Sequence, residues 1–415
     1  MKKYFFLLLF ALSGLYTTAF AQDAVTSHVT ASEVLATARR VNDYFMAQVP
    51  DPTTPTLVKR ERSSNLWTRG VYYEGLMALY GIDPNPAYLD YTDRWGDFHG
   101  WQPRGGDKAT NADNQCCCQT YLDRYMQTAD SRRIDHVRAN LDFQMQTKIG
   151  WWTWVDAIQM AMPVYTKMYR ITGDQRYADH AMKMYIWARD TLAGGLFNER
   201  EGLWWRDKDY VPPYQEQDGS NCYWSRGCGW AYVAIVKALD DFSARPMDKT
   251  IRRHYRLLRK DFQRMSLALL KCQRDDGFWN PSLLCPSNYG GKELTGTALF
   301  LCGMSWGIRQ GLLSARRYRQ ACDRAWAAMA TDGVHPDGFL GYVQGTGKEP
   351  ASAQPVTYER HPDFEDFGTG CFLLGAAEYY LLLNKPCGLG MSRRAFSSAR
   401  PTGTLLQACA RPLVA

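Results

Sequence analysis

The sequence has few of the residues that build metal centres and disulfide scaffolds. Its 415 residues include twelve cysteines and seven scattered histidines, with neither an HExxH motif nor a Cys/His pair at zinc-ligand spacing. Cys116 to Cys118 are consecutive, and successive helical side chains point in different directions, so these thiols are not expected to share a metal ion. We therefore expect no metal and no cofactor. Most cysteines are expected to be small core residues, with one or two disulfides left open.

Long apolar runs and an excess of one charge are also lacking from most of the chain. The formal net charge of +7 arises from the two ends, because residues 1–21 hold two lysines and residues 385–415 hold five bases without an acid. Residues 22–384 then hold 42 bases against 42 acids. A neutral body lacks the basic face that nucleic-acid binding requires, and no run after residue 21 is long and apolar enough to span a bilayer.

The two ends of the chain differ from its body. Residues 1–21 combine two lysines, an apolar run and a small-x-small site ending at Ala21, which is the pattern of a secretory signal peptide. The residue directly after Ala21 is Gln22 rather than cysteine, so no lipid anchor is expected. We expect the protein to be secreted across the inner membrane into the periplasm. Residues 385–415 contain one aromatic residue and no clear period, which predicts a disordered tail outside the fold.

Apolar residues recur with a helical period over most of residues 22–384. The pattern predicts twelve helices in six antiparallel pairs, most of them joined by short turns that hold Gly, Asp, Asn or Pro. Strand signals are few and short, near Trp204, Trp279 and Tyr342. The expected helices span residues 31–48, 67–80, 86–99, 114–128, 132–146, 155–171, 175–191, 224–241, 247–272, 294–311, 315–328 and 366–383.

The second helix of each pair is the less polar one. The stretch over 294–311 is apolar on nearly all sides, whereas the stretch over 247–272 has a clear charged face. A helix that is apolar all round is buried, and an amphipathic helix lies outside it. Six inner and six outer helices in alternation predict an all-α (α/α)6 toroid, a single catalytic domain over residues 22–384. An open α-solenoid is the alternative, but repeat arrays usually show stronger self-similarity.

In such a toroid the inner helices all begin at one end, so their first residues converge. Aromatic faces beside acids suit a sugar ring, and helix N-termini with arginine suit an anion. We infer that an acidic sugar binds there. The residues at the expected inner-helix starts are Trp67, Arg69, Asp113, Trp154, Asp156, Trp224, Arg226, Glu293, Thr295, His361, Asp363 and Asp366.

Asp156 is the main catalytic candidate. Three indoles, at positions 151, 152 and 154, lie within five residues of it, and partial desolvation raises the pKa of a carboxyl so that it can deliver a proton near neutral pH. An aspartate at a helix start is more often only a cap, and the same alternative applies to Asp113. The indole cluster and the second acid favour catalysis, with Asp113 and Asp156 working as a pair.

Arg226 lies in the run YWSRGCGW, flanked by Trp224 and Trp230. A planar guanidinium can bind a carboxylate through two hydrogen bonds, so Arg226 is a candidate to hold the acid group of a uronic ring. A structural ion pair or an aromatic stack explains the same spacing equally well. Arg69 and Arg206 are weaker candidates for substrate binding.

Seven motifs extend this interpretation to a family. LWTRGVYYEGLMALY, NADNQCCCQTYLDRY, WWTWVDAIQMAMPVYTKMYRITGD, GLWWRD, YWSRGCGWAYVAIVKAL, ELTGTALF and VQGTG followed by DFEDFGTGCFLLGAAEYYLL occur in order over residues 30–384. Together they resemble glycoside hydrolase family 105, the unsaturated rhamnogalacturonyl hydrolases. The resemblance implies the (α/α)6 barrel and a pectin-derived oligosaccharide substrate whose non-reducing end is a 4,5-unsaturated galacturonic acid, as left by lyases.

The resemblance also implies roles for individual residues. Asp156 matches the general acid/base of the W-x-D-A-x-x-M motif, and Asp113 matches the second aspartate. Trp224 and Arg226 match the W-S-R-G element that faces the uronate ring. Arg206 departs from the pattern because some members have a histidine there, which leaves the sugar next to the uronate open.

The implied reaction is the hydration of a vinyl ether. Protonation at C4 leaves an oxocarbenium centre at C5, water adds to that centre, and the resulting hemiketal opens and expels the neighbouring sugar. Asp156 alone serves both proton transfers. Asp113 would bond ring hydroxyls or the water, while tryptophans such as Trp67 and Trp154 stack on the sugar and keep the site dry.

Two other classes of function remain open from the sequence. One is an inverting glycosidase that acts on saturated glycosides with Asp113 as base and Asp156 as acid. The other is an exported glycan-binding protein whose aromatic residues only stack on sugars.

A second departure from the family pattern is Asn114, which follows Asp113 where a second aspartate is common. We expect this change to affect how Asp113 is supported. The aglycone, the chain length and the oligomeric state are not indicated.

Overall fold

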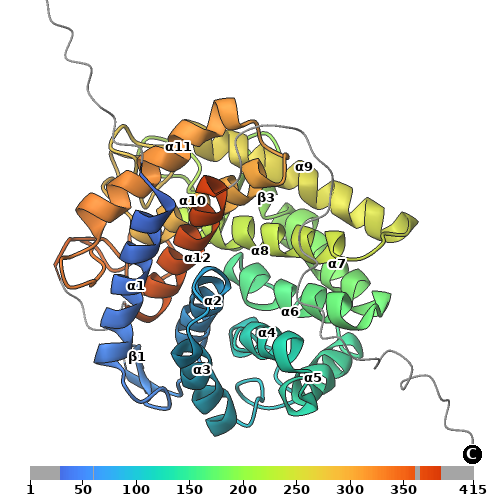
Figure 1. The fold of residues 1–415 in the computed structure, drawn as a ribbon. Helices are drawn as coiled ribbons and strands as arrows, with labels where there is room; N and C mark the ends of the chain where they lie inside the picture. Colours follow the sequence, from blue (N-terminus) through green and yellow to red (C-terminus); the bar gives the residue numbers. More distant parts are fainter. Residues whose placement is uncertain (1–28, 59, 360–364, 385–415) are drawn as a thin grey trace, which may run out of the picture.

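The computed structural model describes residues 29–58, 60–359 and 365–384. Within these residues twelve α-helices form an inner and an outer ring (Figure 1). The predicted leader and tail, together with His361 and Asp363, lie outside the described residues. The helices are α1 Ala31–Gln48, α2 Trp67–Ile82, α3 Pro86–Phe98, α4 Cys118–Thr128, α5 Asp135–Met145, α6 Asp156–Thr172, α7 Gln175–Asp190, α8 Ser225–Ser243, α9 Lys249–Cys272, α10 Leu294–Arg309, α11 Ala315–Ala328 and α12 Glu365–Leu383.

The even-numbered helices make the inner ring. Helices α2, α4, α6, α8, α10 and α12 contact one another in that order, and α12 closes the ring against α2. Helices α7, α9 and α11 pack outside α6, α8 and α10, and α1 packs against α12. Helix α10 is buried from Leu294 to Ile308, whereas α9 buries one stripe only. The predicted (α/α)6 toroid is therefore confirmed.

Local capping explains several of the helix ends. Thr30 and Glu33 form a reciprocal capping box at the start of α1. Helix α3 begins with Pro86 behind the capping side chain of Asn85, and α6 ends at Gly173, whose φ is 76°. These signals lie within a few residues of each end, which is why the expected and observed bounds agree closely.

The inner helices approach one another through glycine. A Cβ atom on Gly75 of α2 would lie 2.5 Å from the carbonyl oxygen of Gly370 on α12. The two backbones are thus in direct contact where the ring closes, and a side chain at either position would push the helices apart.

Short strands and turns join the helices. Strands β1 Thr56–Val58 and β2 Arg60–Arg62 form one antiparallel hairpin, and β3 Phe197–Asn198 and β4 Leu203–Trp204 form another. The strand signal near Trp204 is confirmed, whereas Trp279 makes only an isolated bridge to Glu293. The β1–β2 hairpin was not predicted. Three short 3-10 helices, η1 Ala112–Asn114, η2 Ser131–Arg133 and η3 Leu192–Gly194, and one short π-helix, η4 Met329–Gly333, also occur in the described residues.

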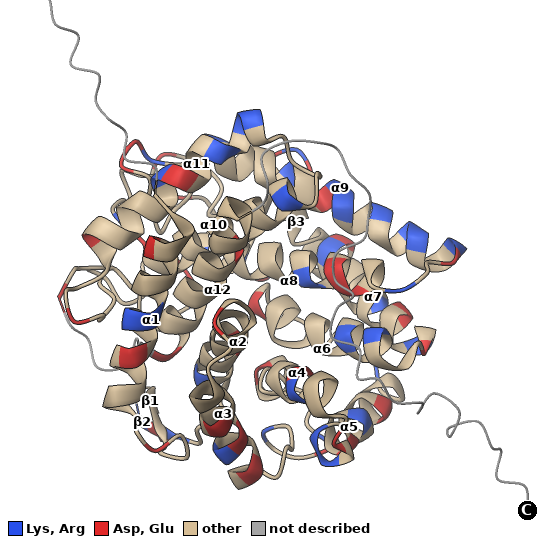
Figure 2. Ribbon diagram, viewed as in Figure 1, with Lys and Arg blue, Asp and Glu red and all other residues tan. Residues whose placement is uncertain are grey.

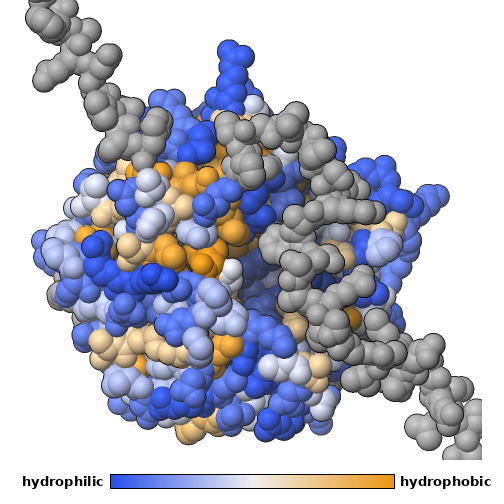
Figure 3. Space-filling model, viewed as in Figure 1, coloured by the Kyte–Doolittle hydropathy of each residue, from blue (hydrophilic) through white to orange (hydrophobic). Residues whose placement is uncertain are grey.

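Charged residues lie mainly on the outer helices and the loops, and the inner ring carries few (Figure 2). The face seen in Figure 3 is mostly hydrophilic, with hydrophobic side chains gathered over α10 and α12. All ten cysteines of the described residues are unpaired, and nine of them are buried.

The helices in the described part of the chain are all too short or too polar to cross a membrane.

Candidate active site

A cavity of about 660 Å³ opens where inner helices α2, α4 and α6 begin. It brings together five residues that the sequence singled out, although they come from four separate segments. The five are Trp67, Asp113, Trp154, Asp156 and Arg206, and the other lining residues are Val58, Arg62, Met160, Thr346, Gly347, Lys348, Glu349, Ser352 and Ala353.

Asp156 is the first residue of α6, and Val155 occupies the N-cap position, so the capping alternative does not describe this carboxylate. The side chain is only 11% exposed, and its Oδ2 lies 3.4 Å from Nε of Arg206. Burial raises the pKa of Asp156, and the charges of Arg206 and Arg226 oppose that rise. A carboxyl in this environment keeps its proton to a higher pH than an ordinary aspartate does.

Asp113 lies in the turn η1 that precedes α4. Its backbone N–H donates to the side chain of Asn111 over 2.8 Å, which fixes the turn at the edge of the cavity. Burial and the charge of Asp156 raise the pKa of Asp113 to about 7, against the opposing charges of Arg206 and Arg104. Burial thus favours the protonated form of both acids, as a proton donor requires.

Arg206 is positioned by the strand that precedes it. Its carbonyl oxygen accepts the N–H of Val155 over 2.7 Å, so the segment after β4 is tied to the start of α6. Its guanidinium donates to Asp207 over 2.6 Å and contacts Asp156 at 3.4 Å. A cation therefore lies beside the candidate acid, at the position where some proteins of the resembled family have a histidine.

Trp67 and Trp154 supply aromatic surface to the cavity, and both are only partly buried. The indole of Trp67 is held by an edge contact with Trp230 and a tilted contact with Phe367. Trp152, in contrast, is fully buried in the core. Of the three indoles near Asp156, Trp154 is therefore the one that faces the cavity.

Neither Arg226 nor Trp224 is among the described residues that line the cavity. Arg226 is fully buried, and its two terminal nitrogens donate to the carbonyl oxygens of Gln344 and Gly345 over 2.6 and 2.8 Å. Its guanidinium stacks on the rings of Trp224 and Phe367. The aromatic stack proposed as an alternative is therefore present, and both arms of the guanidinium also bond backbone carbonyl groups of the protein.

Arg69 is also absent from the described residues that line the cavity. Its side chain is 3% exposed, its Nε lies 3.1 Å from Asp366, and its guanidinium covers the ring of Phe45. Substrate contact by Arg69, Trp224 or Arg226 stays a prediction from the family pattern, and the observed contacts of all three are with the protein.

Two parts of the cavity were missed from the sequence. The β1–β2 hairpin contributes Val58 and Arg62, and the segment after Gly345 contributes six lining residues. The hairpin strands have only three residues each, too few for a period to be detected. For the second part, the sequence offered only the family motif VQGTG, which includes Thr346 and Gly347.

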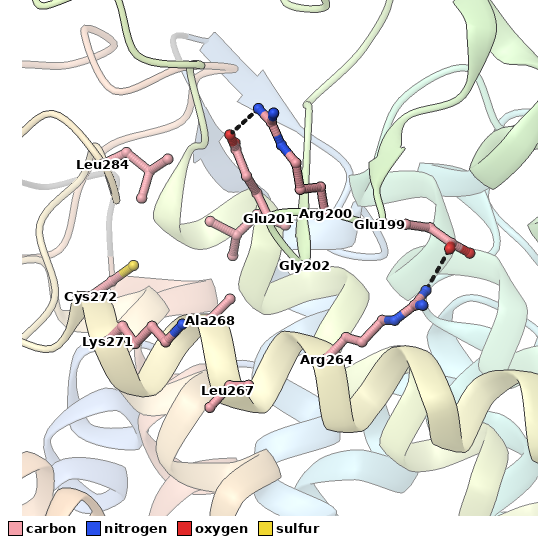
Figure 4. Close-up of a pocket in the computed structure, with 11 residues that line it drawn as sticks. Glu199, Arg200, Glu201, Gly202, Arg264, Leu267, Ala268, Lys271, Cys272 and Leu284 are labelled. Atoms are coloured by element: carbon pink, nitrogen blue, oxygen red, sulfur yellow. Dashed lines mark hydrogen bonds and ion pairs between the residues drawn. The ribbon is translucent and has the colours of Figure 1, made fainter.

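A smaller cavity of about 360 Å³ lies between the β3–β4 hairpin and α9 (Figure 4). Its acids are paired with neighbouring bases, Glu199 with Arg264 over 2.7 Å and Glu201 with Arg200 over 3.3 Å. The rest of its lining is largely aliphatic. This cavity presents ion pairs where the larger one presents two acids with raised pKa values, so the larger one is the candidate active site.

An (α/α)6 barrel with two acids and aromatic rings at the inner-helix N-termini suits a carbohydrate-active enzyme. Family comparison agrees, because the family described as Glycosyl Hydrolase Family 88 matches residues 37–383. The chain therefore belongs to Glycosyl Hydrolase Family 88 and is a glycoside hydrolase. The match supports this family, and it does not by itself place the chain in the related family 105.

Named relatives and a solved structure are similar over long stretches. A protein from Formosa agariphila, named an unsaturated 3S-rhamnoglycuronyl hydrolase, is 29% identical over 75% of this chain and 83% of its own length. A protein of the same name from an Alteromonas species is 32% identical over 56% of this chain and 52% of its own. The structure of a family 88 glycosyl hydrolase from Bacteroides vulgatus is 31% identical, with a TM-score of 0.75, over 85% of this chain and all of that one.

Proposed function

We propose that this hydrolase removes a 4,5-unsaturated uronic acid from the non-reducing end of lyase-generated oligosaccharides. The observation that carries the proposal is the carboxyl of Asp156, buried at a cavity wall with a raised pKa, next to Arg206 and in the same cavity as Asp113. The names of the Formosa and Alteromonas relatives support an unsaturated uronyl substrate.

The resemblance to family 105 supports a finer proposal about the substrate. We propose that the unsaturated end derives from a galacturonate of pectin, specifically of rhamnogalacturonan. Elimination across C4 and C5 removes both stereocentres, so ends that derive from galacturonate and from glucuronate are the same ring. A cavity that binds this ring cannot distinguish the two parent polymers by it. Discrimination has to come from the neighbouring sugar, and the name rhamnoglycuronyl leaves that question open.

The residues at the cavity account for each step of the proposed reaction. Asp156 donates its proton to C4, and the electron pair of the C4=C5 bond forms the new C–H bond while the ring oxygen stabilises the cation at C5. Asp156, now a carboxylate, accepts a proton from the water that adds at C5. Arg206 stabilises the carboxylate form of Asp156, and Asp113 holds the water. The hemiketal opens at the bond between C5 and the ring oxygen, which leaves a ketone at C5 and a hemiacetal at C1. The hemiacetal then breaks its bond to the neighbouring sugar, which leaves with a proton, and C1 becomes an aldehyde.

The substrate carboxylate needs a cation that faces the cavity. Arg62, Arg206 and Lys348 all line it, whereas the guanidinium of Arg226 is fully buried. We therefore propose these three cations, rather than Arg226, as partners of the uronate. We also propose, from the pattern of residues 1–21 alone, that the enzyme is exported to the periplasm.

An absorbance assay tests the proposed function. The conjugated uronate absorbs in the ultraviolet, so a rhamnogalacturonan digested by a lyase should lose absorbance when the enzyme is added, with one new reducing end for each double bond lost. Oligosaccharides released from the same polymer by acid hydrolysis have saturated ends and serve as the control. Release of sugar from the saturated control at an equal rate would favour the inverting glycosidase instead.

A further inference from the structure

Residues 346–353, here termed the wall segment, form one side of the cavity without belonging to a helix or strand. A loop of this kind has to be fixed by other contacts if it is to present a defined surface to a substrate. Within the segment, the N–H of Lys348 donates to the hydroxyl of Ser352 over 3.1 Å. The N–H of Ser352 also donates to the carbonyl oxygen of Glu349 over 3.1 Å, and further anchors come from outside the segment.

Gln344 is the principal anchor. It is fully buried, and its Nε2 lies within hydrogen-bond distance of the carbonyl oxygens of Glu349, Pro350 and Ser352, at 3.1, 3.1 and 2.8 Å. Its Oε1 accepts the indole N–H of Trp224 over 2.7 Å. One amide therefore gathers the far end of the wall segment and ties it to the start of α8.

Arg226 fixes the near end of the same segment. Its two terminal nitrogens donate to the carbonyl oxygens of Gln344 and Gly345, directly before the wall segment begins. Buried carbonyl groups that lose such partners cost free energy, so the wall segment would rearrange if the anchor were removed. The acid pair lies on η1 and α6, which carry neither anchor.

We propose that Gln344 is a positioning residue that fixes the wall segment in its substrate-binding shape. The proposal rests on the proposed function, because it concerns the same cavity. The amide of Gln344 lies outside the cavity lining and acts on substrate only through the segment it holds. Its loss should therefore weaken substrate binding while the proton transfers at Asp156 continue.

The test replaces Gln344 with methionine, which keeps the length of the side chain but removes the amide donors. Gln344→Met should raise KM roughly ten-fold and change kcat by no more than about three-fold, with the pH profile of kcat unchanged. Hydrogen exchange at residues 346–353 should accelerate in the same variant. Gln354→Leu removes one 2.7 Å bond to the wall segment, at Pro350, and the bond that Gln354 Oε1 accepts from the N–H of Val356 over 3.1 Å. Because it removes only one anchor of the segment, it should shift both readouts less and in the same direction.

Gln273 offers a matched control away from the cavity. Its Nε2 donates to the carbonyl oxygens of Gly277 and Ala321, each over 3.0 Å, and its Oε1 accepts from Arg324. Gln273→Met should lower the melting temperature without moving KM. The proposal is overturned if the Gln344 and Gln273 variants change KM equally, or if Gln344→Met lowers kcat at constant KM.

Hydrogen exchange separates this proposal from the proposed function. If wild type fails to act on unsaturated uronides, the proposed function is wrong, while faster exchange of the wall segment in Gln344→Met would still support the anchor. Should Gln344→Met not fold, Gln354→Leu decides by the same two readouts, and unchanged exchange and KM in that variant would reject the anchor model.

Discussion

The carboxyl of Asp156 is subject to two opposing influences. Burial raises its pKa, which favours the protonated acid, while Arg206 lowers the pKa and stabilises the carboxylate that remains after proton transfer. An acid that has to donate a proton and then accept one in the same turnover requires both forms to be accessible. The environment of this one residue therefore matches the chemistry of a single acid/base.

Asp156→Asn is expected to abolish turnover while it leaves folding and substrate binding largely intact. The amide keeps the shape of the carboxyl but cannot shuttle a proton, and general acid/base catalysis contributes about two to four orders of magnitude in rate. Initial rates and a binding titration on the same preparation check both parts. Retention of more than half the wild-type rate would exclude Asp156 as the acid/base.

Arg206→Gln is expected to move the alkaline limb of the kcat profile to higher pH. The active form of Asp156 is protonated, so activity falls as the pH rises through its pKa, and removal of the neighbouring cation raises that pKa further. Arg206→Lys keeps the charge and should shift the limb less. A limb that stays in place or moves to lower pH in the glutamine variant would contradict the assignment.

Asp156 and Arg226 show what could and could not be predicted at this scale. The position of Asp156 followed from local sequence, because its indole neighbours and its helix start lie within a few residues. The partners of Arg226 are backbone carbonyl groups 118 and 119 positions away, and a carbonyl leaves no mark on the amino-acid pattern. The carboxylate-binding role was inferred from the side-chain type, its neighbours and the family pattern, none of which records these carbonyl partners, and the role stays a prediction.

Among the elements, the inner helices depend on small residues where they meet. Gly75 touches α12 through its backbone, whereas a Cβ atom added to Gly81, on the same helix, would have no atom of the described residues within 4 Å. The helical period predicted α2 correctly but gave no indication of which glycine faces a neighbour. Helix α4 begins at Cys118 rather than near 114, because η1 takes the preceding residues into a tighter turn that positions Asp113.

Gly75→Ala and Gly81→Ala form a matched pair on α2. The first places a methyl group 2.5 Å from the carbonyl oxygen of Gly370 and should destabilise the fold by about 1 to 3 kcal/mol. The second adds a methyl group in open space and should stabilise the helix by about 0.5 to 1 kcal/mol. Urea denaturation gives both values, and equal midpoints for the two variants would show that ring closure does not require Gly75.

At the scale of the whole molecule, the barrel is complete before the final segment of the chain. Helix α12 ends at Leu383 and already closes the inner ring against α2. The alternation of less polar and amphipathic helices predicted this closure. Five of the six inner helices are apolar on nearly all sides in the sequence, whereas α4 leaves its second half partly exposed. The cavity wall after Gly345 was not predictable in the same way, because its shape depends on buried hydrogen bonds rather than on a period.

Deletion of residues 385–415 is expected to change the melting temperature and the activity little. Among the described residues, the ring is closed by contacts between α12 and α2, and the removed segment has no apolar face in its sequence. Calorimetry and the absorbance assay on full-length and truncated enzyme check this together. A truncated chain that melts without cooperativity would show that the segment packs on the barrel.

The central claim is that Asp156 protonates C4 of an unsaturated uronate. The most direct measurement is turnover of a lyase-generated oligosaccharide in heavy water, followed by mass spectrometry and NMR of the released uronic product. At early times, before the hydrogens beside the C5 ketone exchange with solvent, the account predicts one deuteron bonded to C4 on a single face of the wild-type product. Asp156→Asn should release almost no product over the same time. A product that retains its double bond and carries no deuteron at C4 would show direct hydrolysis of the glycosidic bond and contradict the account.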